Sequence, residues 1–335
     1  MIKHTFILIF FILNTKFLIA EINHKYEESE VILNTKTGNI SGTLTIARKP
    51  KISPVVLIIA GSGPTDRDGN SALNLKSDAY KMLAIKLAAN GISSLRYDKR
   101  GIGKSNLALK KESEANFNNY VNDAVEWLKL LKSDKRFSKI IIIGHSEGSL
   151  IGILAAKQLN MDGFISLAGA GRSADEIILE QIKNSYPKYV PEAKNILDSL
   201  LIGKMVDSIK PEMKSLFRKS VQPYMISWLK YDPSVEIKDL KIPILIIHGT
   251  TDVQLPVEDA NLLATSTSAS TTFSNSVSST KAKLVIIKNM NHVLKDCDDD
   301  IKKNLATYNN PDLPLNKELV TEIVSFINGI SNKNN

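Results

Sequence analysis

The stretch of sequence that decides the fold is KIIIIGHSEG, residues 139–148. Its run of isoleucines is typical of a β-strand that is buried on both faces of a sheet. Residues 144–148 then fit the pattern G-x-S-x-G, and apolar residues at helical spacing follow from Ser149. The two glycines permit a tight strand-to-helix turn that lifts a serine hydroxyl above the sheet. Because the pattern stands between a strand and a helix, we interpret Ser146 as a nucleophile rather than as part of a plain turn.

Outward from this stretch, the chain alternates between strand and helix patterns. Short apolar runs predict strands at Pro54–Ala60, Ile92–Tyr97, Lys139–Gly144, Phe164–Ala168, Pro243–His248 and Lys283–Ile287. Helical spacing predicts helices over Ser77–Ala89, Asn118–Leu131, Ser149–Leu159 and Asn316–Ile330. Glu30–Thr35 and Ile40–Ile46, joined by a turn that contains glycine, predict a hairpin. This alternation predicts the α/β class, with a mostly parallel central sheet that helices cover on both faces.

Two segments interrupt the alternation. Residues 172–234 lie between two predicted buried strands and carry helical patterns only. We therefore expect a helical cap inserted into a core that consists of residues 30–171 and 235–331. Ala264–Thr280 is mostly Ser and Thr, and this composition predicts a mobile surface loop.

A serine nucleophile needs a general base and an acid that orients the base. Of the five histidines, only His292 follows both Ser146 and a credible acid. Asp252 is that acid, because it comes directly after the predicted strand PILIIH, while Asp175 follows an earlier strand and is the rival. His145 adjoins the serine on a turn that should point neighbouring side chains apart. We therefore predict a catalytic set of Ser146, Asp252 and His292.

The negative charge that develops on a substrate oxygen requires two fixed N–H donors. We expect one from the backbone of Glu147, the residue after the nucleophile. The loop Gly61-Ser62-Gly63-Pro64 follows the strand PVVLIIA, and its glycines allow the backbone to approach a substrate closely. The backbone N–H of Ser62 is our choice for the second donor, and a plain turn is the alternative interpretation of this loop.

These motifs resemble those of bacterial α/β-hydrolases of the serine-aminopeptidase-like group, which includes esterases, thioesterases and acyl-peptide-cleaving enzymes. The resemblance rests on AGSGPTDRDGN (60–70), RYDKRGIGKS (96–105), GHSEG (144–148), HGTTD (248–252) and NMNHVLK (289–295). It implies the α/β-hydrolase fold, in which the catalytic residues follow in the order Ser, Asp, His. It also implies that Asp98-x-Arg100-Gly101 is mainly a structural loop. The chain has Ala60-Gly61 where the group usually has His-Gly, a departure that keeps the backbone donor.

Composition limits the class of protein. The chain has 335 residues, of which 43% are hydrophobic and 23% charged, and its one cysteine is Cys297. These values exclude a disordered chain and a disulfide framework. The net charge is +8, but the basic residues are spread along the chain. We therefore expect no nucleic-acid partner and attribute the charge to solubility and weak surface steering.

Residues 1–20 are typical of a secretory signal peptide. Lys3 gives a positive start, Phe6–Leu13 is an unbroken apolar run, and Ala20 suits the position before a cleavage site. The alternative is an uncleaved anchor, although the apolar run is shorter than the roughly 20 residues that span a bilayer. We expect cleavage near Ala20, a periplasmic or secreted protein, and no stable membrane span afterwards.

The residues and the resemblance together predict a serine hydrolase that cleaves a carboxylic ester or thioester through an acyl-enzyme on Ser146. Its partner would be a small-molecule acyl substrate, and no metal or organic cofactor is expected. One alternative is a peptidase that releases an N-terminal residue, with Glu147 or cap carboxylates binding the free amine. A second alternative is a non-catalytic binding protein on the same fold, and the oligomeric state stays open. Apolar cap side chains should form part of the acyl pocket, among them Met205, Phe217, Tyr224, Met225 and Trp228.

Overall fold

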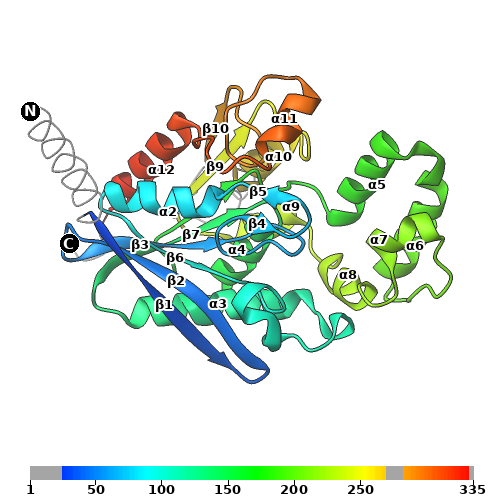
Figure 1. Cartoon of the computed structure of the whole chain (residues 1–335), viewed down its shortest axis with the longest axis horizontal. Coiled ribbons are helices and arrows are strands. Elements are labelled where there is room, and N and C mark those ends of the chain that lie inside the picture. The colour runs from blue at the N-terminus through cyan, green and yellow to red at the C-terminus, as the bar shows by residue number, and fades with distance from the viewer. Residues whose placement is uncertain (1–24, 269–281, 332–335) are drawn as a thin grey trace, which may run out of the picture.

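The computed structural model describes residues 25–268 and 282–331, so the predicted signal peptide lies outside the described residues. Its centre is an eight-stranded sheet. The strands are β1 (Tyr26–Thr35), β2 (Gly38–Ala47), β3 (Ser53–Ile59), β6 (Ser93–Tyr97), β7 (Phe137–His145), β8 (Gly163–Leu167), β9 (Ile244–Gly249) and β10 (Lys283–Ile287). Two further short strands, β4 (Asn70–Ser71) and β5 (Leu75–Lys76), pair with each other. Figure 1 shows the sheet between helices, with the β1–β2 hairpin at one side.

The sheet is mostly parallel, as the sequence predicted. Its strand order is β1-β2-β6-β3-β7-β8-β9-β10. The strands β1, β2 and β6 pair antiparallel, and every other neighbouring pair is parallel. Parallel strands all end at the same edge of a sheet, where ligands of open α/β sheets bind. The loops that follow β3, β7, β9 and β10 therefore meet at one edge, and these loops contain the predicted site residues.

Alternate residues of the central strands face opposite helical layers. In β3, Val55, Leu57 and Ile59 belong to the apolar cluster that includes α3 (Phe117–Ser133), α4 (Glu147–Gln158) and α10 (Val257–Ser268). Val56 and Ile58 belong to the opposite cluster, with α2 (Ala79–Ala89) and α12 (Lys317–Gly329). A strand buried on both faces must be apolar throughout, which explains the unbroken apolar runs in the sequence.

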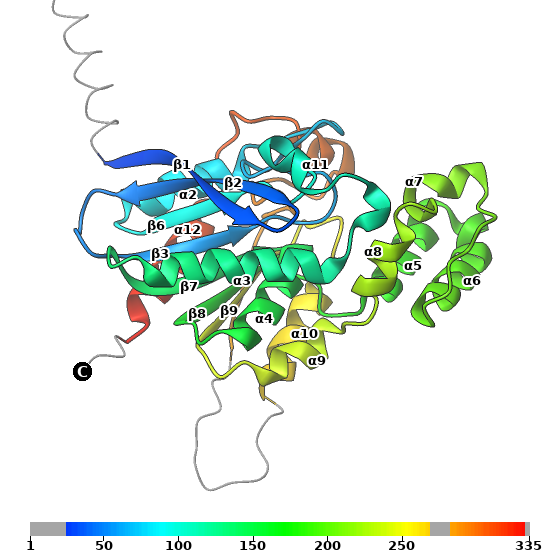
Figure 2. The same cartoon turned by 90° about the horizontal axis from the view of Figure 1, so that it is seen from below.

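The cap contains the helices α5 (Ala174–Ser185), α6 (Val190–Leu201), α7 (Lys214–Phe217) and α8 (Gln222–Trp228). These helices share an apolar cluster of their own, with Leu200 and Phe217 fully buried in it. They lie together on one side of the core in both views (Figures 1 and 2). The chain then returns to the core through α9 (Pro233–Glu236), and α11 (Ile301–Thr307) precedes α12. Short 3₁₀ helices occur at Gly103–Ala108, Glu112–Glu114, Pro187–Tyr189, Pro211–Met213 and Ile237–Asp239.

Several hydrogen bonds fasten the cap to the core, among them those that Arg218 and Ser220 donate to Glu112. The backbone N–H of Phe117, at the start of α3, donates to Ser227 Oγ in α8 at 2.8 Å. Gln181 Nε2 in α5 donates to the backbone carbonyl of Gln254 at 3.2 Å. Both Gln181 and Gln254 line the cavity toward the cap that is described below.

The prediction of a loop over Ala264–Thr280 is wrong for Ala264–Ser268. Ala264–Ser268 continue α10, which begins at Val257. Serine and threonine have low helix propensity, but a hydroxyl can donate to a carbonyl of the preceding turn. Thr267 Oγ1 donates to the Ala264 carbonyl at 2.7 Å, and both Ser266 and Thr267 are buried against the core. Packing thus overrides propensity here, and the rest of the segment, 269–280, lies outside the described residues.

Within residues 25–268 and 282–331, no helix combines the length and the apolar character that crossing a bilayer requires.

Candidate active site

Ser146 lies on a sharp turn between β7 and α4. Its backbone has φ 53° and ψ −123°, a conformation that is rare for a residue with a side chain. Neighbouring positions must be glycine, because a Cβ on Gly144 would lie 2.2 Å from the Gly148 carbonyl oxygen. A Cβ on Gly148 would lie 2.3 Å from the carbonyl oxygen of Ile59 in β3. The two glycines therefore let the turn pack tightly, and strain at the serine marks a functional position.

Asp252 and His292 form a hydrogen-bonded pair. Asp252 Oδ2 lies 2.7 Å from His292 Nδ1, and the Asp252 side chain is 1% exposed. Its Oδ1 accepts from the backbone N–H groups of Gln254 and Leu255 at 2.8 and 3.0 Å. Burial opposes ionisation of Asp252, but the charge and hydrogen bond of His292 outweigh it, so the pKa lies below the usual value. Asp252 is thus held as a carboxylate that orients the imidazole.

The structure brings the pair to the nucleophile. Ser146 and His292 line the same cavity, which has a volume of about 180 Å³. Since Nδ1 of His292 faces Asp252, its Nε2 is the atom left to take a proton from a hydroxyl. The rival acid, Asp175, instead lies in the first turn of α5 in the cap.

The oxyanion loop lies against the nucleophile. A Cβ on Gly61 would lie 3.1 Å from Ser146 Cβ, which places the Gly61–Ser62 peptide beside the serine. The N–H of Glu147 is the first of α4, so it has no carbonyl in the preceding turn to bind. Ser62, Ser146 and Glu147 line one common cavity. Both predicted donors therefore border the space in front of the Ser146 hydroxyl.

His145 has a structural role that the sequence did not indicate. Its Nε2 donates to the backbone carbonyl of His292 at 2.8 Å. Its Nδ1 is then free of a proton and accepts from the Tyr80 hydroxyl at 2.7 Å. Tyr80 in turn accepts from the N–H of Gly61 at 3.2 Å. One buried chain of hydrogen bonds thus joins the loop of the base to the oxyanion loop, and both ring nitrogens of His145 are used.

Burial controls the protonation of this chain. Desolvation, with the nearby His292, lowers the pKa of His145 to about 3, so the ring is neutral at physiological pH. Burial also raises the pKa of Tyr80, which keeps its hydroxyl as a donor. The hydrogen-bond directions described above are therefore fixed over the physiological pH range.

The loop after β6 contributes two structural arginine pairs and one unexpected lysine. Asp98 accepts from the backbone and guanidinium of Arg67, and Arg100 pairs with Asp123 inside the core. These contacts agree with the structural role implied for Asp98-x-Arg100-Gly101. The Lys99 side chain instead reaches the oxyanion loop, where its Nζ donates to the Gly61 carbonyl. It also lies 3.7 Å from Glu147 Oε1.

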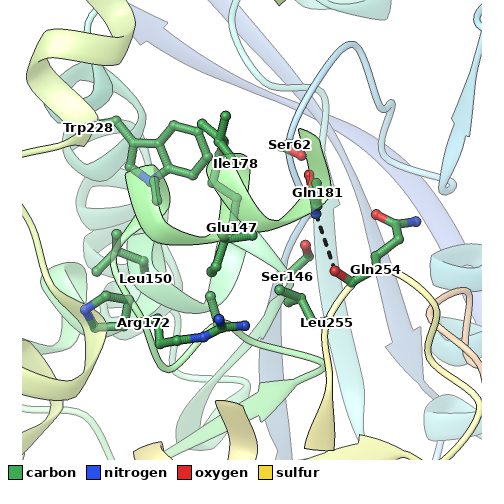
Figure 3. A pocket seen from close by; sticks show the side chains of 14 residues that line it. Ser62, Ser146, Glu147, Leu150, Arg172, Ile178, Gln181, Trp228, Gln254 and Leu255 are labelled. Atoms are coloured by element: carbon green, nitrogen blue, oxygen red, sulfur yellow. Dashed lines mark hydrogen bonds between the residues drawn. The ribbon is translucent and has the colours of Figure 1, made fainter. Parts of the chain in front are cut away.

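A second cavity opens from Ser146 toward the cap, with a volume of about 120 Å³ (Figure 3). Apolar side chains make up much of its wall: Leu150, Ala174, Ile177, Ile178, Trp228, Pro233 and Leu255. Figure 3 shows Trp228, Ile178 and Leu150 to one side, with Ser146 and Ser62 toward the other. The wall also includes the polar side chains of Arg172, Gln181 and Gln254.

The prediction that five apolar cap side chains form part of the acyl pocket is wrong for four of them. Of the five, only Trp228 lines the cavity. Phe217 and Met225 are buried in the apolar cluster of the cap, and Tyr224 packs against it. Met205 is 43% exposed. Helical spacing identifies an apolar face but not whether that face meets another helix or a ligand.

No group of three or more His, Cys, Asp or Glu side chains suited to a metal ion occurs in the described part of the chain.

Comparison with known proteins identifies the family and the fold of the chain. The family model for serine aminopeptidase, S33, matches residues 72–297, which is more than half of the chain. The esterase EstD of Thermotoga maritima is 28% identical over 251 residues, which cover 71% of this chain and 55% of EstD. A monoglyceride lipase homolog of monkeypox virus is 26% identical over 195 residues, covering 58% of this chain and 61% of that protein. The chain thus spans somewhat more than half the length of these two relatives.

Among solved structures, Est1E from Butyrivibrio proteoclasticus has the same fold. The TM-score is 0.55 at 17% identity, and the match covers 89% of this chain and 99% of Est1E. The predicted fold is confirmed, since the mostly parallel sheet, the sharp turn at the serine and this neighbour agree. The chain has the α/β-hydrolase fold and belongs to the serine aminopeptidase S33 family.

Proposed function

We propose that this chain is a serine hydrolase that cleaves a carboxylic ester or thioester through an acyl-enzyme on Ser146. The observation that carries the proposal is the 2.7 Å contact between Asp252 and His292, at a cavity that His292 shares with Ser146. An oriented imidazole beside a hydroxyl on a strained turn is the arrangement that activates a serine.

The proposed reaction begins when His292 Nε2 takes the proton of Ser146 Oγ. Ser146 Oγ then bonds to the acyl carbon, and the electrons of the carbonyl double bond move to the carbonyl oxygen. The backbone N–H groups of Ser62 and Glu147 stabilise the negative charge on that oxygen. Collapse of this intermediate breaks the bond to the leaving group, which takes the proton from His292 and departs as an alcohol or thiol. Water then repeats the sequence on the acyl-enzyme, releasing a carboxylic acid and returning the proton to Ser146.

The two cavities suggest where the two halves of the substrate bind. We place the acyl chain in the cavity toward the cap, whose wall includes Leu150, Ile178 and Trp228, and the leaving group in the cavity that includes His292. A volume of about 120 Å³ is close to that of cavities that hold benzene, roughly 150 Å³. We therefore expect medium-length acyl chains to be preferred over acetyl, because each buried methylene contributes about 0.8 kcal/mol. The esterase and lipase names of the two relatives support an ester substrate.

The aminopeptidase alternative rests on one observation. Glu147 lines the cavity toward the cap, and a carboxylate there could bind the free amine of a peptide. Lys99 Nζ, however, lies 3.7 Å from this carboxylate and compensates its charge. A pocket without net negative charge gives an ammonium group little attraction, so the ester is the better supported substrate.

A panel of substrates distinguishes these functions. We would measure kcat/KM for p-nitrophenyl esters from acetyl to octanoyl, for matched thioesters, and for aminoacyl p-nitroanilides, with Ser146→Ala as the control. The proposal predicts that the esters or thioesters are cleaved fastest, with a maximum beyond acetyl, and that Ser146→Ala cleaves none of them. Faster cleavage of the anilides would support the peptidase instead.

We also propose export from the cytoplasm, on the signal-like residues 1–20. N-terminal sequencing of the protein from its native host should then find a start near Glu21. Intact Met1 on protein from the cytosolic fraction would contradict this proposal.

A further inference from the structure

Lys99 and Glu147 form a buried ion pair directly behind the oxyanion loop. The Lys99 side chain is 4% exposed and the Glu147 side chain 3% exposed. Within the described residues, neither carboxylate oxygen of Glu147 makes a short hydrogen bond, and its polar neighbours are Lys99 and the Tyr224 hydroxyl. Burying two charges costs more than a surface pair returns, and a pair of apolar side chains would often stabilise the fold as well. The pair is therefore a poor choice if its only role is stability.

The contacts of Lys99 point to the oxyanion hole. Its Nζ donates to the carbonyl of Gly61. That carbonyl and the N–H of Ser62 belong to one planar trans peptide, so they point in opposite directions. A cation on the carbonyl side fixes the orientation of the peptide and polarises the N–H on the other side. The Tyr80 hydroxyl accepts from the Gly61 N–H at 3.2 Å, so the preceding peptide is held as well.

Glu147 connects the two donors. Its backbone N–H, at the start of α4, is the other proposed oxyanion donor, and its side chain is the counter-ion of Lys99. The aromatic ring of Tyr120 lies 5.8 Å from Lys99 Nζ and shields the ammonium group from water. Glu147 thus sets the position of its own N–H and, through Lys99, the position of the Ser62 N–H.

We infer that Lys99 is a positioning residue that orients and polarises the Ser62 N–H of the oxyanion hole, and that the Glu147 carboxylate holds it in place. This inference rests on the proposed serine-hydrolase function. Lys99 acts through the Gly61–Ser62 peptide and does not touch the substrate. The positive charge of Lys99 stabilises the negative charge that develops on the substrate oxygen. Lys99 therefore stabilises the transition state more than the bound ester.

Protonation of Lys99 is part of this role. Burial lowers the pKa of Lys99, while the adjacent Glu147 raises it and offsets part of that effect. The groups around the pair are Tyr120 of α3 and Tyr224 of α8, whose pKa values burial and the Glu147 charge raise, so both stay neutral. Neither tyrosine therefore adds a charge beside Lys99.

The first test replaces the ammonium by an apolar chain of similar shape. Lys99→Met should lower kcat for p-nitrophenyl butyrate about 10- to 100-fold, less than the 10²- to 10³-fold that follows loss of an oxyanion donor. KM should stay within about threefold, because the ester binds before the charge develops. The inhibition constant of a trifluoromethyl ketone should rise by the same factor as kcat/KM falls. Lys99→Arg, which keeps a charge and a donor, should recover part of kcat.

The matched control is Lys139→Met. Lys139 also donates from Nζ to a backbone carbonyl, that of Ile330, but it lies near the start of β7, away from Ser146. This variant should keep the wild-type kcat and ketone inhibition. If Lys99→Met does not fold, the double variant Lys99→Met/Glu147→Gln removes both charges and should show the same loss of kcat.

A second readout depends on protonation. Glu147→Gln removes the group that raises the pKa of Lys99, so activity should begin to fall at lower pH on the alkaline side than in wild type. Lys99→Met should lack this alkaline limb. Wild-type kcat and ketone inhibition in Lys99→Met, or an unchanged alkaline limb in Glu147→Gln, would overturn the inference while Ser146-dependent ester cleavage still stood. If wild type cleaves no ester, the proposed function fails first.

Discussion

The Nε2 atom of His145 lies 2.8 Å from the backbone carbonyl oxygen of His292. The residue beside the nucleophile therefore holds the loop that carries the base. The two imidazole rings are also close, with centroids 4.8 Å apart. Burial lowers the pKa of His145 to about 3, so the ring is neutral and Nε2 carries its one proton toward this carbonyl. Its Nδ1 is then the acceptor for the Tyr80 hydroxyl.

Stability should fall as the pH is lowered toward 3, because of His145. Its pKa is lowered from 6.5 to about 3 in the folded protein, so between these values the unfolded chain binds a proton that the folded chain does not. The free energy of unfolding should then decrease with falling pH by up to about 1.4 kcal/mol per unit from this group. His145→Gln keeps a donor toward His292 and does not titrate. Urea unfolding at several pH values between 4.5 and 7 should give a smaller pH dependence for His145→Gln, and equal slopes would contradict the prediction.

Asp252→Asn should lower kcat by about 10³- to 10⁴-fold without unfolding the protein, because the amide no longer fixes the imidazole tautomer. The matched control is Asp175→Asn, in the first turn of α5. It should keep kcat within about twofold, as for most surface changes. Steady-state kinetics of both variants with the same ester measure this difference in kcat. A large loss in Asp175→Asn, together with normal turnover by Asp252→Asn, would transfer the acid role to Asp175.

Trp228→Ala should shift the preference toward longer acyl chains. Trp228 forms part of the wall of the cavity toward the cap, and its removal makes room for further methylenes, each adding about fourfold in kcat/KM at 0.8 kcal/mol. The ratio of kcat/KM for decanoyl over butanoyl esters is the measurement, because it does not depend on the amount of active protein. Met205→Ala, at an exposed cap methionine, should leave the ratio unchanged. No change in Trp228→Ala would show that the acyl chain binds elsewhere.

Gly144→Ala should prevent the strand-to-helix turn from forming. The added Cβ would meet the Gly148 carbonyl at 2.2 Å, and that oxygen belongs to the backbone and cannot move aside. Gly329→Ala is the control, since a Cβ there meets nothing within 4 Å and the residue is helical. We expect a loss of several kcal/mol or no soluble protein for Gly144→Ala, and a gain of about 0.5–1 kcal/mol for Gly329→Ala. Thermal unfolding measures both, and a normal midpoint for Gly144→Ala would contradict the tight turn.

Local patterns predicted the sheet and the sharp turn at Ser146 well. The run KIIIIG and its neighbouring strands are apolar because both faces are buried, a condition that leaves a direct trace in sequence. Asp252 and His292 were predictable for a related reason, since each directly follows a strand and all these strands end at one edge of the sheet.

What the sequence did not indicate depends on contacts between distant segments. Lys99 resembles any solvated loop lysine, and its burial arises from α3, α4 and the Gly61 loop together. His145 was expected to point away from the site, yet its ring lies beside His292, which is remote in sequence. In the cap, likewise, the spacing of apolar residues did not distinguish Trp228 from residues that pack only within the cap.

The most direct test of a serine nucleophile is covalent labelling with a fluorophosphonate, followed by intact mass and peptide mapping. The reagent bonds to an activated serine oxygen with loss of fluoride. We predict a single adduct on wild type, located at Ser146, no adduct on Ser146→Ala, and strongly slowed labelling of Asp252→Asn. Folded wild-type protein that gains no adduct, or an adduct that persists at another residue in Ser146→Ala, would contradict the account and favour a non-catalytic binding protein or a different nucleophile.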